Sequence, residues 1–592
     1  TPEFKEAVAV LLHLVNAQKN QFTAQGITNL LWAMAKLVDS GQERTPEFKE
    51  AVAVLLHLVN AQKNQFTAQG ITNLLSAMVK LVDGQERTPG IKKTAATLLP
   101  HVNAQKANFK PQEIANLLWA MAKMVDNGQE RTSEFKKAVA ALLPLVNAQK
   151  DQFSAQDIAI LLWAMAKLVD NGQERTSELN KAVAALLPLV NAQKDQFSAQ
   201  DIAILLWAMA KLVDNGQERT SELNKAVAAL LPLVNAQKAN FKPQGIANLL
   251  WAMAKLVDSG LEQTPELKEA VAALLPHVNR QKDQFIPQHV ANLLWAMTKL
   301  VDNGQEQTPG LNEAVVALLS LVNAQKDQFK PQGIANLLWA TAKLGELVEL
   351  KLATSTFESL VYRISENLQF SQEEISMSLW GVMVCCARLA QAPNANKNNV
   401  LEKHMDDLLT RLENTSPGHK EDQSTMIMAA SWLGRACPVV CHYQTNISKT
   451  QAYFRDQLKS SIPSLKIEDE KSLNSLPSVD LLLPDHNIVI EVQGPYHYVG
   501  GDFKTRNGST LLKIALLQKA GFEVIEIPAN QLLNKELMKP YIDQIKIRVS
   551  ITPQSRDSVS LKRGWTDIAY VTAEEHSEEQ TNPAKRKKTN GQ

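Results

Sequence analysis

Hydrophobic residues recur along most of the chain in two alternating runs, and each run has the spacing of an amphipathic α-helix. We expect the first helix of one copy to begin at residues 45–47 (Thr-Pro-Glu), because threonine is a good N-cap, proline is tolerated in the first turn and an early Glu suits the helix dipole. Its buried face is predicted from residues spaced i, i+4, i+7 and i+11, which are Phe48, Val52, Leu55 and Val59.

The second run begins at FKPQ or FSAQ and continues through IANLLWAMAKLV, which predicts a second helix after the loop NAQKDQF. It stops at Asp-Asn-Gly, where glycine can adopt the left-handed conformation that commonly ends a helix. In the first copy, Trp32 lies on another side of this helix and is expected to pack on a neighbouring repeat. The predicted buried face consists of Ile27, Leu30, Leu31, Met34 and Val38.

A period of 44 residues connects these helical pairs, with one spacing of 43 between Ser76 and Trp119. Residues 151–194 and 195–238 are identical, which indicates recent tandem duplication. Repeated helical hairpins of this length stack into an α-solenoid with one continuous core. The residues that share this frame are Trp32, Ser76, Trp119, Trp163, Trp207, Trp251, Trp295 and Trp339.

The predicted fold class is therefore an α-solenoid of roughly 44-residue helical-hairpin repeats, followed by a small α/β domain. The repeat weakens after residue 345, although Phe370 and Trp380 keep the ten-residue interval of Phe22 and Trp32. We expect eight tandem hairpins over residues 1–344, degenerate helical repeats or a cap over 345–450, the α/β domain over 451–550 with its core at 479–535, and a polar, disordered tail over 551–592.

One side of the second helix carries a polar pattern that changes between repeats. At 100° per residue, positions 26, 29, 33 and 36 fall within a stripe roughly 80° wide. Lysines there could meet successive phosphates, alanine would let a ligand approach, and the variable first residue could address a base edge. A solvated face with one lysine per repeat is the alternative. The stripe reads Gly26/Asn29/Ala33/Lys36, Gly70/Asn73/Ala77/Lys80, Glu113/Asn116/Ala120/Lys123, Asp157/Ile160/Ala164/Lys167, Asp201/Ile204/Ala208/Lys211, Gly245/Asn248/Ala252/Lys255, His289/Asn292/Ala296/Lys299 and Gly333/Asn336/Ala340/Lys343.

The segment FKPQGIANLLWAMAKLVD resembles the signature of octotricopeptide repeats, with its Pro-Gln, Leu/Ile-Ala-Asn and Leu-Trp-Ala elements. Proteins of that family are helical-repeat RNA binders, proposed to read about one nucleotide per repeat and to steer maturation, stability or translation of particular transcripts. The resemblance covers residues 1 to about 344, although the units are longer than is usual for the family. Related repeats also occur in bacterial effectors. Together with the stripe, the resemblance implies RNA contacts from Gly26, Asn29, Lys36, Lys80, Glu113, Asn116, Lys123, Asp157, Lys167, Asp201, Lys211, Lys255, His289, Asn292, Lys299 and Lys343.

The charge balance refines this expectation. The chain has 62 Lys and Arg against 61 Asp and Glu, for a net charge of +1. Because the positive charges include one lysine per repeat on the stripe, this balance excludes indiscriminate binding of polyanions but not a local RNA groove. No apolar run reaches about eighteen residues, so we expect no membrane span, and the start of the sequence does not resemble a signal peptide.

The four cysteines are too few for a disulfide framework and suit a reducing interior. Cys385, Cys386, Cys437 and Cys441, with His442, suggest a zinc site. Their spacing is poor for a closed tetrahedral site, however, and favours buried free thiols.

The composition changes from Ser478 onward. The segment VDLLLPDHNIVIEVQGP predicts a strand, a tight turn at residues 484–487 and an apolar strand at 488–492. The segment TLLKIALLQKAGFEVIEIP predicts a helix, a stop at Gly521 and a third strand at 523–527. This order favours a small α/β unit with parallel pairing across the helix.

Asp480 and Glu491 lie on neighbouring strands of this hairpin, where two carboxylates could bind one divalent cation. Glu491 and Gln493 share one side of an otherwise apolar strand, a violation of the local pattern that indicates function. The arrangement resembles the restriction-endonuclease-like PD-(D/E)xK core, which implies Asp480 and Glu491 as metal ligands, Mg²⁺ as the cofactor and metal-dependent ribonuclease activity. Gln493 stands where that family most often has a catalytic lysine, and Lys513 is a further catalytic candidate.

Residues from about 479 to 535 resemble the RAP domain, through VDLLLPDHNIVIEVQGPYHY, a basic loop, the following helix and GFEVIEIP. That domain takes its name from RNA binding and abundance in apicomplexans, and it recurs after octotricopeptide repeats, so the two resemblances reinforce each other. Ordinary loop packing is the alternative for its aromatic loop. The resemblance implies base or sugar stacking and phosphate contacts from Tyr496, His497, Tyr498, Lys504, Arg506 and Lys513.

Two functions stay open. The first is sequence-selective binding of single-stranded RNA by the array, with a RAP domain that binds RNA or also cleaves it, in post-transcriptional control of specific transcripts. The second is a protein-interaction solenoid, for example a bacterial effector acting in a eukaryotic host, with an inert nuclease-like domain. We expect an intracellular monomer without a membrane partner. The basic run Lys585–Lys588 indicates nuclear import or a tail that touches nucleic acid.

Overall fold

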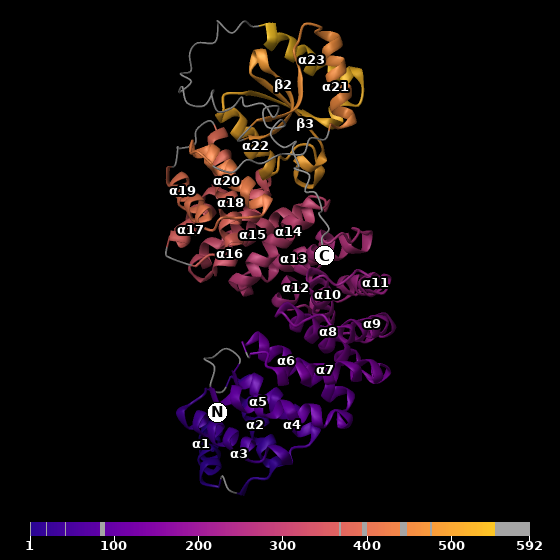
Figure 1. Cartoon of the computed structure of the whole chain (residues 1–592), viewed down its shortest axis with the longest axis vertical. Helices are drawn as coiled ribbons and strands as arrows, with labels where there is room; N and C mark the ends of the chain where they lie inside the picture. Colours follow the sequence, from indigo (N-terminus) through magenta and orange to yellow (C-terminus); the bar gives the residue numbers. More distant parts are fainter. Residues whose placement is uncertain are drawn as a thin grey trace, which may run out of the picture. The chain divides into compact units, whose positions relative to one another are not determined.

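The computed structural model describes residues 2–18, 21–41, 43–82, 89–128, 130–365, 369–392, 399–437, 447–473 and 476–550. The chain forms two compact units, Thr1–Val278 and Asn279–Gln592, and each is described by itself (Figure 1). The predictions for Cys441, His442 and the tail from residue 551, with its Lys585–Lys588 run, lie outside the described residues. No described helix is long and apolar enough to cross a membrane.

The first unit consists of helical hairpins that follow the sequence repeat. A threonine caps the first helix of a hairpin, as where the Thr176 hydroxyl accepts a hydrogen bond from the Leu179 amide at 3.3 Å. The second helix ends just before a glycine with positive φ, such as Gly172 at 81°. Both helix ends are confirmed as predicted. The helices are α1 (Pro2–Ala17), α2 (Ala24–Asp39), α3 (Pro46–Ala61), α4 (Ala68–Val82), α5 (Pro89–Ala104), α6 (Pro111–Asp126), α7 (Ser133–Ala148), α8 (Ala155–Asp170), α9 (Ser177–Ala192), α10 (Ala199–Asp214), α11 (Ser221–Ala236) and α12 (Pro243–Asp258).

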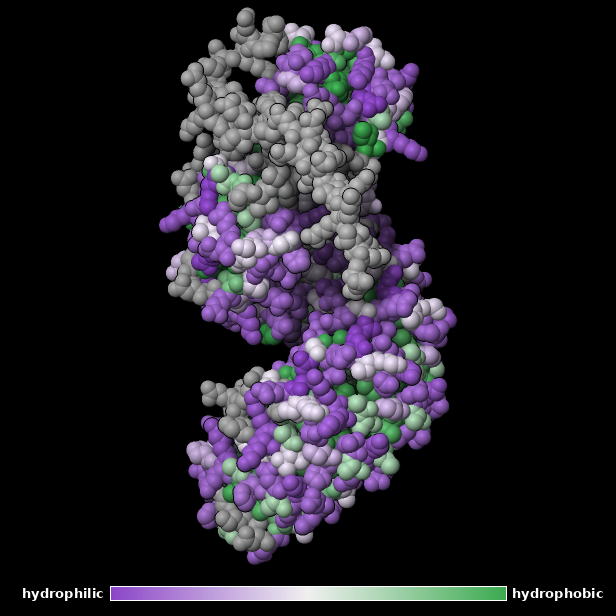
Figure 2. All heavy atoms as spheres, viewed as in Figure 1, coloured by the Kyte–Doolittle hydropathy of each residue, from purple (hydrophilic) through white to green (hydrophobic). Residues whose placement is uncertain are grey.

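Consecutive hairpins stack like on like, which makes the core continuous. Second helices pack on second helices, as α8 does on α6 and α10, and first helices pack on first helices, as α9 does on α7 and α11. Leu205, Leu206 and Met209 of α10 are fully buried as a result. The visible surface over the repeats is mostly hydrophilic, with hydrophobic residues scattered among the polar ones (Figure 2). The predicted solenoid of hairpins is therefore confirmed.

In most hairpins a glutamine at the end of the first helix bonds to the preceding hairpin. The Gln193 Nε2 donates to the Phe153 carbonyl at 3.2 Å, and Gln237 donates to Phe197 at 3.0 Å. These carbonyls lie between a single-turn 3₁₀ helix and the next α-helix, where no helical amide can satisfy them. The bond therefore fixes the distance between neighbouring hairpins, and it recurs at Gln62–Phe22, Gln105–Phe66, Gln149–Phe109 and Gln325–Phe285.

The second unit begins within α13 (Pro265–Arg280) and contains the end of the array together with the C-terminal domain. The helical pattern persists where the sequence repeat decays, because α18 carries Trp380 in the repeat frame and packs on α16. The helices are α14 (Pro287–Asp302), α15 (Pro309–Gln325), α16 (Pro331–Lys343), α17 (Leu350–Ser365), α18 (Gln372–Gln391), α19 (Asn399–Asn414) and α20 (Lys420–Leu433).

The C-terminal domain has a four-stranded mixed sheet in the order β1 (Glu468–Leu473), β2 (Leu476–Leu483), β3 (Ile488–Gln493) and β4 (Glu523–Pro528). The first three strands pair antiparallel, and β3 pairs parallel with β4 across α22 (Gly508–Lys519). The predicted hairpin and parallel pair are confirmed. Strand β1 was not predicted, because its sequence EDEKSL has no alternation of apolar residues.

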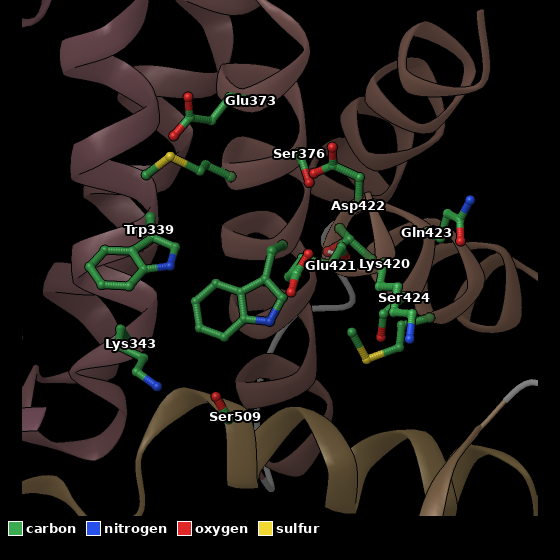
Figure 3. A pocket seen from close by; sticks show the side chains of 14 residues that line it. Trp339, Lys343, Glu373, Ser376, Lys420, Glu421, Asp422, Gln423, Ser424 and Ser509 are labelled. Atoms are coloured by element: carbon green, nitrogen blue, oxygen red, sulfur yellow. Dashed lines mark hydrogen bonds between the residues drawn. The ribbon is translucent and has the colours of Figure 1, made fainter. Parts of the chain in front are cut away.

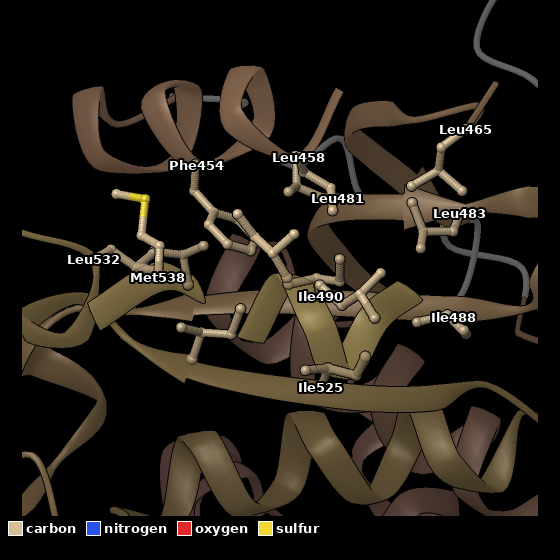
Figure 4. Close-up of a cluster of buried hydrophobic side chains, with 14 residues drawn as sticks. Phe454, Leu458, Leu465, Leu481, Leu483, Ile488, Ile490, Ile525, Leu532 and Met538 are labelled. Atoms are coloured by element: carbon tan, nitrogen blue, oxygen red, sulfur yellow. The ribbon is translucent and has the colours of Figure 1, made fainter. Parts of the chain in front are cut away.

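The sheet is covered differently on its two faces. On one face an apolar cluster packs against α21 (Lys449–Ser461) and α23 (Lys535–Ser550), through residues such as Phe454, Ile490 and Met538 (Figure 4). The opposite face lies toward α22, which also contacts α16, α18 and α20 of the array. Helix α22 therefore lies between the sheet and the end of the array.

Two glycines allow this close packing. A Cβ on Gly508, at the start of α22, would lie 2.1 Å from the Ala342 carbonyl oxygen of α16. A Cβ on Gly345, which has a φ of 51°, would lie 2.3 Å from the Arg506 carbonyl oxygen. That carbonyl accepts from the Glu346 amide at 3.0 Å, and the Glu346 carboxylate accepts from the Arg506 amide at 2.8 Å. The C-terminal domain is thus joined to the array by backbone contact.

We predict that Gly508→Ala loosens this junction, because the added methyl group has no space beside the Ala342 carbonyl. The free energy of unfolding should fall by about 1–3 kcal/mol, as is typical of overpacked sites. Urea denaturation measures the change. Gly494→Ala is the matched control, because a Cβ there meets nothing within 4 Å and its φ is −72°. Equal stability of the two variants would contradict the close packing.

Candidate nucleic-acid interface and carboxylate site

Most second helices of the array present a half-exposed stripe of four residues, which we call the tryptophan stripe; in α4 the tryptophan position is the buried Ser76. In α10 it consists of Gln200, Ile204, Trp207 and Lys211, spaced i, i+4, i+7 and i+11, and all four are partly or fully exposed. The predicted stripe shares two of these four positions, those of Asn29 and Lys36 in the first repeat. Sequence reasoning missed the glutamine and the tryptophan, although the same helical spacing also fits positions 25, 29, 32 and 36.

The tryptophans of successive repeats contact one another. The ring centroids of Trp163 and Trp207 lie 6.5 Å apart with planes inclined by 32°, and those of Trp207 and Trp251 lie 6.4 Å apart, inclined by 33°. The prediction that the tryptophan packs on a neighbouring repeat is therefore confirmed for these residues. Because the rings are half-exposed, their remaining faces form an aromatic surface with one ring in each repeat that carries the tryptophan.

The lysine of the stripe is held between an aspartate and a tryptophan. Lys211 Nζ lies 3.0 Å from an Asp170 carboxylate oxygen of the preceding repeat and 5.1 Å from the ring centroid of Trp251 in the next repeat. About a fifth of the lysine side chain is exposed, at 21%. The array therefore carries neutralised lysines rather than an open row of cations. The same pairing recurs at Lys80–Asp39, Lys167–Asp126, Lys255–Asp214 and Lys343–Asp302, and lysines over tryptophan rings recur at Lys36, Lys80, Lys123, Lys167, Lys255 and Lys299.

The variable residue at the helix start makes local contacts. Asp157 is buried, and its carboxylate accepts from the amide and hydroxyl of Ser154 at 3.0 and 2.7 Å, which forms a capping box. Asp201 repeats this arrangement, and the Glu113 carboxylate accepts from the Lys110 amide at 2.9 Å. The His289 ring lies edge-on to Phe285, and burial lowers its pKa. Gly26 lies beside the cap of its helix, where an added Cβ would be 3.5 Å from the Thr23 hydroxyl oxygen.

The third residue of the predicted stripe serves packing. Ala164 and Ala208 are fully buried, where the next second helix approaches. The stripe asparagines differ, because Asn116 and Asn292 are half-exposed, as is Asn248 of α12. Within the described part of the chain their side-chain amides have no hydrogen-bond partner. These amides are thus available to a ligand, while the alanines are not.

The C-terminal domain carries two adjacent carboxylates on the sheet face toward α22. The Asp480 Oδ2 accepts from the Val492 amide at 2.7 Å, and the Glu491 Oε2 accepts from Lys513 Nζ of α22 at 2.5 Å. Glu491 is 1% exposed, and among the described residues its other oxygen, Oε1, has no hydrogen-bond partner. The structure thus brings together three predicted catalytic residues, Asp480, Glu491 and Lys513.

Burial controls the protonation of these groups. It raises the pKa of Glu491 to about 7, with Lys513 opposing the rise and the Asp480 charge adding to it. Burial also raises the pKa of Asp480, against the opposing charge of Lys513. Two carboxylates whose charged forms are both disfavoured by burial provide a place where a cation would be stabilised.

Gln493, the fourth predicted catalytic residue, belongs to a hydrogen-bonded chain. It is 1% exposed, its Oε1 accepts from the Tyr498 hydroxyl at 2.7 Å, and its Nε2 donates to Glu526 at 2.9 Å. Arg506 donates to Glu526 at 2.9 Å and to Glu346 at 2.6 Å. This chain connects β3 with the end of the array, and sequence reasoning did not identify Glu526 as part of it.

The remaining predicted residues of the domain occupy different environments. Tyr496 is 87% exposed and Lys504 is also exposed. Tyr498 is buried, and desolvation raises its pKa to about 12. His497 accepts from the Thr510 hydroxyl through its backbone carbonyl at 2.9 Å, and burial lowers its pKa to about 4, with the Lys513 charge adding to the effect. Tyr496 and Lys504 are therefore the accessible members of this set, with part of Arg506.

The predicted zinc alternative is only partly within the described residues. Cys385 and Cys386 are buried free thiols, and burial raises the pKa of Cys385 to about 12. Among the described residues no group of three or more His, Cys, Asp or Glu side chains could hold a metal ion.

Two family models match parts of the chain. Residues 490–539 match the RAP domain. A model described as a protein of unknown function (DUF1601) matches in eight stretches, which recur with the repeat. The chain thus carries a RAP domain near its C-terminal end and a tandem helical repeat array. The stretches are residues 6–31, 49–75, 101–118, 133–162, 184–206, 228–250, 266–294 and 316–338.

No curated protein matches the chain. Among solved structures, it is similar to the homology model of the full-length AP-3 complex in an intermediate open conformation, at 10% identity. The similarity covers 72% of this chain and 77% of that chain with a TM-score of 0.26, which is too low to support any inference about this chain.

We predict that Lys513→Met destabilises the C-terminal domain, because it leaves the Glu491 carboxylate buried without its cation. Removal of one partner of a buried ion pair costs about 3 kcal/mol or more. Chemical denaturation at a pH well above the pKa of Glu491, where the carboxylate is charged, measures this loss. Lys504→Met is the control, because Lys504 is exposed and substitutions at such sites change stability by about 0.5 kcal/mol or less. A wild-type stability for Lys513→Met would contradict the ion pair.

Proposed function

We propose that this protein binds single-stranded RNA along the tryptophan stripe and that its RAP domain contacts the same strand. The observation that carries the proposal is the repeating surface of half-exposed tryptophan rings and unpaired asparagine amides. Aromatic faces stack on bases whatever their identity, and amides can hydrogen-bond to base edges. The match to a RAP domain beside helical repeats supports RNA as the partner.

The pairing of stripe lysines with aspartates lowers the electrostatic part of the expected binding energy. A stripe lysine that pairs with an aspartate must exchange part of this contact for a phosphate, so the electrostatic gain at such a repeat is small. Base stacking, which contributes about 1–3 kcal/mol per base, therefore supplies most of the affinity. This protein should select RNA by its bases and not by its backbone charge.

One stripe position varies in a way that suits base discrimination. Asparagine occupies it in six repeats, and isoleucine occupies it at Ile160 and Ile204. An asparagine amide can pair with the edge of adenine, whereas isoleucine offers only apolar contact. The identity of this residue, half-exposed beside the tryptophan, would set the base preferred by each repeat.

We predict that Asn248→Ile changes the base preference at one position of the bound RNA, because it removes the free amide of one repeat. Ile204→Asn, in the adjacent repeat, should change a neighbouring position in the opposite direction. Selection of bound sequences from a random RNA pool, followed by sequencing, measures both preferences. Lys225→Ala, on the exposed side of α11 and paired only with Glu222, is the control and should leave the selected sequence unchanged.

Two results would contradict this proposal. If the wild-type chain enriches no RNA sequence and binds no RNA at low salt, the array has another partner, such as a protein. If both variants change the preference at every position together, the repeats do not read single bases.

The carboxylate pair supports a second candidate function, cleavage of the bound RNA. The buried Glu491 Oε1 lacks a partner, and Asp480 lies beside it, so the residues present fit a hard divalent cation such as Mg²⁺. Asp480 and Glu491 would hold it. A bound Mg²⁺ would supply Lewis-acid stabilisation of charge on a phosphate.

The chain's own residues would position the substrate around this pair. Lys513 pairs with Glu491 and would contact a phosphate of the bound RNA, in the role that the PD-(D/E)xK family most often gives to a lysine on the strand. Gln493 is uncharged and therefore cannot replace the catalytic lysine. Its hydrogen bonds to Tyr498 and Glu526 hold it in place. Exposed Tyr496 would stack on a base next to the site.

We predict that Asp480→Asn abolishes Mg²⁺-dependent cleavage of a bound RNA and leaves its affinity within about threefold of wild type, because the asparagine oxygen can still accept from the Val492 amide. Gel analysis of a labelled RNA measures cleavage, and filter binding measures affinity. Asp485→Asn, in the exposed turn before β3, is the control. A wild-type chain that leaves RNA intact with both Mg²⁺ and Mn²⁺ would limit the RAP domain to binding.

A further inference from the structure

A cavity of about 760 Å³ lies at the end of the array in the second unit, between α16, α18 and α20 and the first turn of α22. Figure 3 shows Trp339 and Lys343 on one side, residues of α20 on the other and Ser509 of α22 below. The cavity therefore opens where the repeats meet the RAP domain. Its volume is sufficient for a nucleotide.

The aromatic wall of this cavity differs from the rest of the tryptophan stripe. In several repeats a lysine lies over the tryptophan ring of the next repeat, as Lys299 does over Trp339 at 5.3 Å. At the following step Lys343 pairs with Asp302 at 3.2 Å, and no cation lies over the Trp380 ring within the described residues. The degenerate repeat also has Val384 where earlier repeats have their lysine. Trp380 thus offers an uncovered aromatic surface to the cavity.

The polar groups of the cavity include hydrogen-bonding atoms without partners. Ser376 is 7% exposed and lines the cavity, yet its hydroxyl bonds to no other described residue. The Glu421 carboxylate, on the first turn of α20, also has no partner in the described part of the chain, and Figure 3 shows it toward the middle of the cavity. A ligand with donors on its edge would satisfy both groups.

We propose that this cavity binds a guanine nucleotide of single-stranded RNA, at the point where the strand leaves the array. Guanine presents adjacent N1–H and N2–H₂ donors, which can bond to the two oxygens of one carboxylate, whereas the matching edge of uracil presents mostly acceptors. The base stacks on Trp380, and its Watson–Crick edge reaches Glu421. The exposed Lys420 at the rim meets the phosphate. This assignment rests on the proposed RNA binding for its biological ligand.

Isothermal titration of the full chain with GMP, AMP, CMP and UMP tests the cavity by itself. We expect GMP to bind at least tenfold more tightly than UMP. Trp380→Leu should weaken GMP binding by about tenfold or more, as the loss of one base stack implies. Tyr362→Leu is the matched control and should leave GMP binding unchanged, because Tyr362 is an exposed aromatic residue of α17 outside the cavity and the stripe.

Glu421→Gln tests the edge contact without disturbing the fold, because Glu421 is exposed. It should reduce the preference for GMP over UMP to less than about threefold and leave UMP binding unchanged. The proposal is overturned if the wild type does not bind GMP, if all four nucleotides bind equally, or if Tyr362→Leu loses as much affinity as Trp380→Leu. An affinity for cationic peptides in place of GMP would likewise overturn it.

The same variants separate this cavity from the array. Binding of GMP without binding of any RNA pool would support the cavity and contradict the proposed function. Selection of an RNA by the array without GMP binding would support the proposed function and contradict the cavity assignment.

Discussion

The whole array depends on the inability of one hairpin to bury its own apolar surface. Each helix pair has an apolar face that only the next copy can cover. Stacking of the copies buries the leucines of α10 completely. Apolar burial alone would permit sliding between hairpins. The bond from Gln193 to the Phe153 carbonyl and the pair between Lys211 and Asp170 occur at one spacing only, so they fix the register that burial leaves free.

This register has a chemical consequence for the surface. Because the lysine and aspartate that lock two repeats also lie beside the tryptophans, the stripe combines rigidity with neutrality. At the C-terminal end the stripe is no longer neutral. The degenerate repeat lacks the lysine and leaves Trp380 beside Glu421, whose carboxylate has no partner among the described residues. The RAP domain is held against this end by backbone contacts that only Gly345 and Gly508 allow. The aromatic surface, the cavity and the carboxylate pair of the second unit therefore belong to one packed arrangement around α22.

The sequence predicts most of the array, because periodicity, capping threonines and terminal glycines all act locally. It predicts the β2–β3 hairpin and the parallel β4 for the same reason. Strand β1 escapes prediction, since its pairing with β2 is decided by tertiary contact and not by its charged sequence. Among site residues, Asp480 and Glu491 could be paired from strand alternation, but the distance from Lys513 to Glu491 depends on how α22 packs. A polar residue near a helix start suits both a base edge and a helix cap, so the sequence alone favours a ligand contact for Asp157. Its capping bond to Ser154 becomes visible only in three dimensions.

The identical copies at residues 151–194 and 195–238 have a consequence for how such a chain changes over generations. Each of the two copies has the same surface toward the preceding hairpin and the same surface toward the following one. A further copy inserted between them would therefore form only interfaces that already exist. Recombination can therefore lengthen or shorten the array in whole units without a compensating substitution, and each event would add or remove one tryptophan step of 6.5 Å. The length of the chain is thus itself a heritable variable, which selection can adjust separately from the residues that line the surface.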